Sequence, residues 1–141
     1  MQTSVILTGL FFVVCVAAEA LAFVNAPCEG KSWQIMQTSN DTSKAGKINL
    51  NNSEIKLGQP FSFEFKICDD ESNKPDRVTA NAMMPAHQHG MNYTPKVTYD
   101  RSKQRYHIEG FVFHMPGRWE ITISSYRDDS VIHYTQDVTL N

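Results

Sequence analysis

The sequence predicts an all-β fold, and three observations carry that prediction. Apolar residues alternate with polar ones in a series of short runs from Trp33 to the end of the chain. Turn-forming residues separate these runs at intervals of roughly ten residues. No window of ten or more residues after the N-terminal apolar segment shows the 3.6-residue period of an amphipathic helix. We therefore expect an antiparallel immunoglobulin-like β-sandwich of about seven strands.

Each predicted strand has one apolar face, because successive side chains of a strand point to opposite sides. The predicted strands are residues 61–67, 78–84, 96–100, 106–113, 119–123 and 132–140. The turn signals lie at residues 57–60, 69–75, 100–102, 115–117 and 127–130. Gly110 interrupts the fourth run, which indicates a β-bulge or close packing at that point. The segment 37–52 is rich in Ser, Asn, Lys and Gly and is predicted to form a loop.

The N-terminus carries the pattern of a signal peptide. Residues 5–18 read VILTGLFFVVCVAA and contain no charge. A run of this length is too short to cross a hydrocarbon layer of about 30 Å comfortably. Small residues follow it, which predicts cleavage near Ala20 or Ala22. We therefore assign residues 1–22 to a signal peptide and residues 23–141 to the sandwich domain. Because residues 1–4 contain no Lys or Arg, an uncleaved membrane anchor remains the alternative. The protein is expected to be exported, periplasmic or extracytoplasmic.

The net charge and the cysteines limit which partners and which cysteine chemistry the protein can have. The formal net charge of −2 offers no electrostatic footprint for nucleic acid. Of the three cysteines, Cys15 lies in the predicted signal peptide, which leaves Cys28 and Cys68. In an oxidising compartment such a pair predicts a disulfide. A thiolate metal site is the alternative, but the sequence has no CxxC spacing to support it.

Histidine and methionine concentrate in one part of the sequence. The chain has six Met and five His, and four of each lie between residues 83 and 115. Residues 83–91 read MMPAHQHGM and residues 113–117 read FHMPG. Imidazole and thioether together suit copper, whereas a zinc site more often includes Cys or carboxylate. Neither segment contains such a residue. The predicted copper ligands are His87, His89, Met91, His114 and Met115.

The two segments must meet if they form one site. His87 and His89 are two residues apart, so in an extended segment they would point the same way. If both segments end strands of the same sandwich, His114 or Met115 could complete a site with Met91.

Simple packing is the competing interpretation of several of these residues. Met adapts to irregular gaps in cores, and Met84 continues the inward-facing series of residue 82. Met83 and Met84 are therefore assigned to packing. His107 and His133 fall on the polar faces of their strands and are predicted to be ordinary surface residues.

Together, the two segments resemble the YtkA-like domain family, which is related to FixH-like proteins. Residues 84–91 match a pattern of the form MPxHxHGM, and residues 113–119 match FxMPGxW, with Tyr106 and Gly110 between them. The resemblance implies an exported, immunoglobulin-like β-sandwich, often membrane-associated, with roles in copper handling or oxidase assembly. This chain departs from the family pattern in its predicted disulfide and in His114 within the second segment.

The sequence thus predicts an exported copper-binding accessory protein, with a copper ion and either a membrane oxidase or another copper protein as partners. An enzyme is not expected, because the sequence has no nucleophile elbow, paired-carboxylate motif, phosphate loop or HExxH. The alternative is a metal-free immunoglobulin-like interaction module in the periplasm or at the membrane surface. In that case residues 84–91 form a structural turn only.

Overall fold

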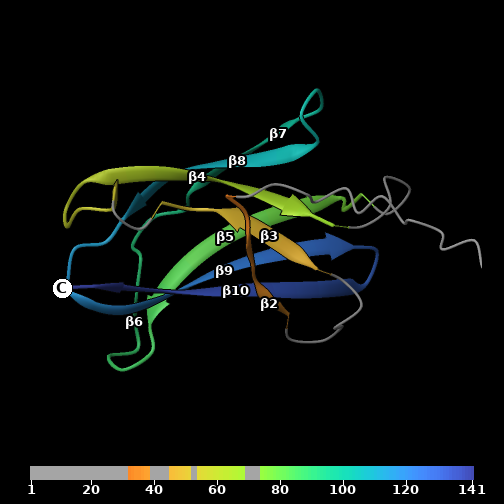
Figure 1. Ribbon diagram of the computed structural model, residues 1–141. Helices are drawn as coiled ribbons and strands as arrows, with labels where there is room; N and C mark the ends of the chain where they lie inside the picture. Colours follow the sequence, from red (N-terminus) through yellow and green to blue (C-terminus); the bar gives the residue numbers. More distant parts are fainter. Residues whose placement is uncertain (1–31, 39–44, 52–53, 69–73) are drawn as a thin grey trace, which may run out of the picture.

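A computed structural model describes residues 32–38, 45–51, 54–68 and 74–141 of the chain. These residues form two antiparallel sheets that face each other as a sandwich (Figure 1). Every regular element of the described residues is a β-strand, which confirms the predicted fold class. The predicted signal peptide, residues 1–22, lies outside the described residues.

Each sheet has five strands. The first sheet has the order β1-β3-β4-β8-β7, formed by Gln34–Ile35, Gly46–Asn49, Pro60–Ile67, Arg105–Val112 and Lys96–Asp100. The second has the order β2-β10-β9-β5-β6, formed by Gln37–Thr38, Ser130–Leu140, Gly117–Arg127, Arg77–Met84 and His89–Gly90. The ten strands exceed the predicted seven because β1, β2 and β6 are two residues long.

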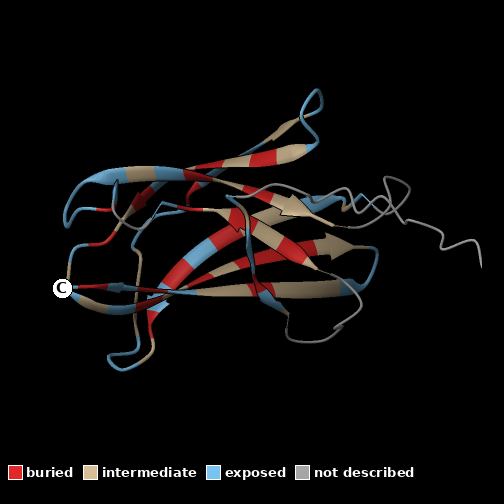
Figure 2. Cartoon of the chain, in the orientation of Figure 1, coloured by how far each residue is buried: buried red, intermediate tan, exposed pale blue. Residues whose placement is uncertain are grey.

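The core lies between the sheets and is rich in aromatic side chains. Figure 2 shows buried and exposed residues alternating along β5, as the sequence pattern predicts. The largest fully buried side chains include Trp119, Tyr134, Phe65, Phe111 and Phe113. Large aromatic groups contribute much of the apolar area that folding removes from water. The two sheets are therefore held together chiefly by this aromatic layer.

The segment 37–52 differs from its prediction as a loop, because it contains β2 and β3. Ile48 is fully buried in β3, and Gly46 lies against the Tyr134 ring of the opposite sheet. A Cβ atom at residue 46 would come within 2.4 Å of Cδ1 of Tyr134. The glycine therefore gives an aromatic side chain room to pack, and its presence does not mark a turn.

Gly110 forms a β-bulge, as one of the two sequence interpretations predicts. Phe61 pairs with Phe111 and Ser62 pairs with Glu109, so Gly110 is the extra residue on β8. Its φ of +93° lies in the region that favours glycine. A Cβ atom there would meet nothing within 4 Å, so close packing is not the reason for the glycine.

Cys68 follows the end of β4, and its amide donates to the carbonyl of Ala45. Its sulfur is disulfide-bonded. Cys28 lies outside the described residues, so the pairing of Cys28 with Cys68 stays a prediction.

Candidate metal site

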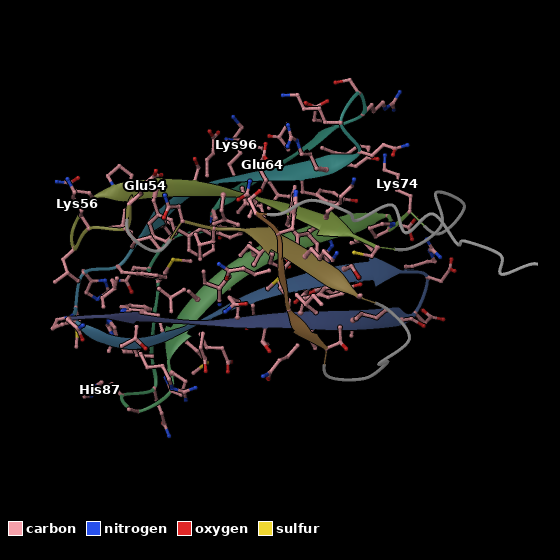
Figure 3. The ribbon with its side chains drawn as sticks, in the orientation of Figure 1. Glu54, Lys56, Glu64, Lys74, His87 and Lys96 are labelled. Carbon is pink, nitrogen blue, oxygen red and sulfur yellow. The ribbon has the colours of Figure 1, made fainter. Side chains whose placement is uncertain are left out.

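The first His/Met segment forms a tight hairpin between β5 and β6. Residues 85–88 make a four-residue turn, and Met84 pairs with His89 across it. The amide of His87 donates to the Met84 carbonyl at 3.2 Å, and Gln88 has a left-handed φ of +50°. The segment is therefore not extended between the two histidines, so the condition under which His87 and His89 would point the same way is not met. His87 instead lies exposed at the tip of the hairpin (Figure 3).

His89 and Met91 share a face of the hairpin. Residues directly opposite each other in an antiparallel pair project to the same side of the sheet. His89 lies opposite Met84, which is 2% exposed, and the amide of Met91 bonds the carbonyl of buried Ala82. Both His89 and Met91 are therefore directed toward the buried side of β5. His89 is the outermost member of this face, at the end of the sandwich.

The second His/Met segment is the loop from residue 113 to residue 116, between β8 and β9. Phe113 stacks on Trp119, with ring centroids 4.6 Å apart and an interplanar angle of 14°. The indole Nε1 of Trp119 donates to the carbonyl of Met115 at 3.0 Å. The amide of Gly58 donates to the carbonyl of Phe113 at 2.8 Å. The residues on both sides of His114 are thus fixed, while His114 itself is exposed.

The two segments meet through their histidines. The Nε2 atoms of His89 and His114 lie 2.7 Å apart, and the ring planes cross at 74°. One ring donates its N–H and the other accepts with its lone pair, so the two nitrogens share one hydrogen bond. His114 also contacts Trp119, with ring centroids 5.4 Å apart and ring planes at 70°. The sandwich therefore brings two imidazole nitrogens together at one end.

The remaining predicted ligands lie around this pair in different environments. Met91 and Met115 are half-buried and pack against the hydrophobic core. His87 is exposed on the turn. Within the described residues, no group of three or more His, Cys, Asp or Glu side chains could hold a metal ion. The described part of the chain therefore offers two clustered nitrogen ligands, and the two thioethers and His87 are the further candidates from the predicted set.

Two residues outside the predicted ligand set support the site. Trp119 contacts the His114 ring and donates a hydrogen bond to the Met115 carbonyl. Its place at the end of the FxMPGxW pattern is the sequence signal that could have assigned it to the site. Met84 is buried, as predicted, whereas the assignment of Met83 to packing is wrong, because Met83 is 38% exposed. Met84 also reaches Gly117: a Cβ atom at residue 117 would lie 2.8 Å from its Cε. Met84 therefore packs the hairpin against the start of β9.

The other two histidines of the described residues lie outside the site. Nε2 of His107 is 3.7 Å from Oε2 of Glu109, and His107 is about half exposed. Nδ1 of His133 lies 2.8 Å from Oγ of Ser124. Their positions on polar faces were predicted from the alternation of their strands.

The described residues define an all-β sandwich with a histidine pair where a hairpin meets a strand-connecting loop. The family model YtkA-like matches residues 40–124, which include both His/Met segments. The chain belongs to the YtkA-like family. No curated protein and no solved structure shows a significant match to the chain. Within the described residues, no helix has the length and apolar character needed to cross a membrane.

Proposed function

We propose that the protein is an exported copper-binding accessory protein that acts in copper handling or oxidase assembly. The observation that supports this proposal is the 2.7 Å separation of the His89 and His114 Nε2 atoms. Imidazole nitrogen binds copper in either common oxidation state. The partner of the protein is a copper ion, and either a membrane oxidase or another copper protein receives or supplies that ion.

The geometry of the histidine pair fits two ligands of one ion. Imidazole nitrogens bind zinc at about 2.0 Å, and we take a similar length for copper. Two such nitrogens at right angles around the ion are about 2.8 Å apart. The observed 2.7 Å is close to this separation. An ion would replace the proton that the two nitrogens share, and each ring would turn so that its Nε2 lone pair points at the ion.

The thioethers and the third histidine have secondary roles in the proposal. Met91 faces the same side of the hairpin as His89, and Met115 directly follows His114. Both are half-buried, so they are candidates for a third ligand when the ion is Cu(I), which favours soft sulfur. His87, at the tip of the turn, is the outermost candidate.

The test is a copper titration of the protein and of single-histidine variants. Bound copper should quench the fluorescence of Trp119, which contacts His114. We expect His89→Ala and His114→Ala each to weaken copper binding by about tenfold or more, because each removes one of two nitrogen ligands. His107→Ala is the matched control, since it removes an exposed imidazole outside the site. Equal copper binding by all these variants and the wild type would contradict the proposal.

The metal-free interaction module remains the second candidate, and one observation favours it. The histidine pair is already joined by a hydrogen bond, so it holds the hairpin to the loop without any metal. Thermal stability separates the two functions. A ligand that binds only the folded state stabilises it by about 2.7 kcal/mol at a hundredfold excess over Kd. A melting temperature that copper leaves unchanged would favour the metal-free module.

A further inference from the structure

We propose that one Cu(II) ion joins two copies of this chain, through His89 and His114 of each copy. This inference rests on the proposed copper-binding function and extends it to the partner and the ligand set. The bridged surface is the end of the sandwich that carries three loops, residues 56–59, 85–88 and 113–116. Lys56 and His87 mark the first two of these loops at this end (Figure 3). We call this surface the loop end.

The ligand count is the first reason for a second copy. A nitrogen pair 2.7 Å apart fits neighbouring positions around a tetragonal Cu(II) ion, which leaves two positions in the plane open. The described residues add no third His, Cys, Asp or Glu to this pair. Because His114 is exposed, the pair can be reached from outside the sandwich. A second copy offers an identical pair of nitrogens, which fills the plane with four imidazoles.

The composition of the loop end is the second reason. Its three loops contain one charged side chain, Lys56, when histidine is neutral. Leu57 is 42% exposed there and Pro116 is also exposed. The centres of protein interfaces are depleted in charge. The facing loops of two copies therefore carry few like charges, and the repulsion between the two Lys56 side chains is screened by salt.

The loops are also joined to one another in a way that suits a rigid contact surface. The Gly58 amide bonds the carbonyl of Phe113, which links the first loop to the third. The His89–His114 contact links the second loop to the third. A two-fold axis through the ion then places the same patch of each copy against its equivalent, as in an isologous dimer. Metal bonds supply the affinity, so the patch need not reach the area of a stable metal-free interface.

The experiment measures molar mass by light scattering and bound copper per chain as Cu(II) is added to the full chain. We expect the molar mass to double when one ion is bound for every two chains, and a chelator to reverse the change. A monomer with one ion per chain would overturn the dimer and leave the copper proposal intact. A chain that binds no copper would overturn both proposals. The two failures are thus distinguishable.

Two surface variants test where the copies meet. Leu57→Arg adds a charge that cannot ligate copper at neutral pH, so two copies would bring four cations together with Lys56. We expect this variant to bind copper as a monomer, with one ion per chain. Ile35→Arg is the matched control, because Ile35 is 71% exposed on β1, outside the three loops, and it should dimerise like the wild type. Dimerisation of Leu57→Arg at wild-type copper concentrations would overturn the assignment of the loop end as the interface.

Discussion

The side chains of His89 and His114 are in contact through their Nε2 atoms, 2.7 Å apart, although 25 residues separate them in the sequence. The contact connects the β5–β6 hairpin to the loop that precedes β9. Both loops are fixed independently of it, the hairpin by pairing of Met84 with His89 and the loop by the Trp119–Met115 hydrogen bond. The two nitrogens are therefore positioned before any ligand arrives, which lowers the reorganisation that binding requires.

We expect this contact to stabilise the metal-free protein slightly. A hydrogen bond contributes about 0.5–1.5 kcal/mol, and exposure of His114 places this one near the lower end. His89→Ala should therefore lower the free energy of unfolding by about 0.5–1 kcal/mol. His87→Ala should change it by less than about 0.5 kcal/mol, because His87 is exposed on the turn. Urea denaturation with a chelator present measures both. Equal losses in the two variants would show that the histidine contact contributes nothing.

The meeting of the two segments could be predicted from the sequence only in outline. Alternating apolar residues located both strands that carry the segments, and strands of one sandwich can end on the same side. Whether the two segments meet depends on the order of the strands in the sheet, which the alternation of apolar residues does not reveal. In the structure β5 pairs with β9, and this pairing places the loop before β9 beside the hairpin.

The direction of His87 could not be predicted, because it depends on turn geometry. Gln88 adopts a left-handed conformation that non-glycine residues seldom take, and its residue type does not predict it. In the segment 37–52, by contrast, the residue types point to the wrong structure. Its polar composition predicted a loop, but buried Ile48 and the space at Gly46 allow a strand whose partner is distant in sequence.

Gly117→Ala should destabilise the protein at the candidate site. Residue 117 has a φ of +122°, and a Cβ atom there would lie 2.8 Å from Cε of Met84. Strain and overpacking together should lower the free energy of unfolding by about 1–3 kcal/mol. Gly90→Ala is the control, because its Cβ would make an ordinary 3.6 Å contact with the Ala82 carbonyl oxygen. Thermal unfolding of both variants provides the comparison. If the two melt alike, neither the positive φ of residue 117 nor its contact with Met84 is restrictive.

Gly46→Ala should have a comparable effect for a different reason, since it acts inside the core. The added methyl would meet Cδ1 of Tyr134 at 2.4 Å and Cε2 of Phe65 at 2.9 Å. Both rings are fully buried, so neither can move into solvent. Overpacking of a core costs about 1–3 kcal/mol. Chemical denaturation of Gly46→Ala gives this value, and a loss below about 0.5 kcal/mol would mean that the rings move aside freely.

The predicted Cys28–Cys68 disulfide can be tested by peptide mapping without reduction. We expect the two cysteines in one cross-linked peptide. Closure of a loop of about 40 residues restricts the unfolded chain, so reduction or Cys68→Ser should lower the free energy of unfolding by about 4 kcal/mol on the loop-entropy model. Two free thiols in the protein purified without reductant would contradict the pairing.

Tyr106 should make the stability of the protein depend on alkaline pH. Burial, followed by the nearby Tyr99 and Tyr134, raises the pKa of Tyr106 to about 12 from an ordinary value of 10.0. The unfolded chain therefore releases this proton at a lower pH than the folded chain does. The stabilising contribution is fully present below pH 10 and is lost as the pH rises through 12. One pKa unit corresponds to about 1.4 kcal/mol, so the loss reaches roughly 2–3 kcal/mol at most.

Tyr106→Phe removes the titrating group and serves as the reference. The difference between the unfolding free energies of wild type and Tyr106→Phe should change by about 1–2 kcal/mol, against the wild type, between pH 9 and pH 11.5. A constant difference over that range would show that the Tyr106 hydroxyl titrates alike in the folded and unfolded chains.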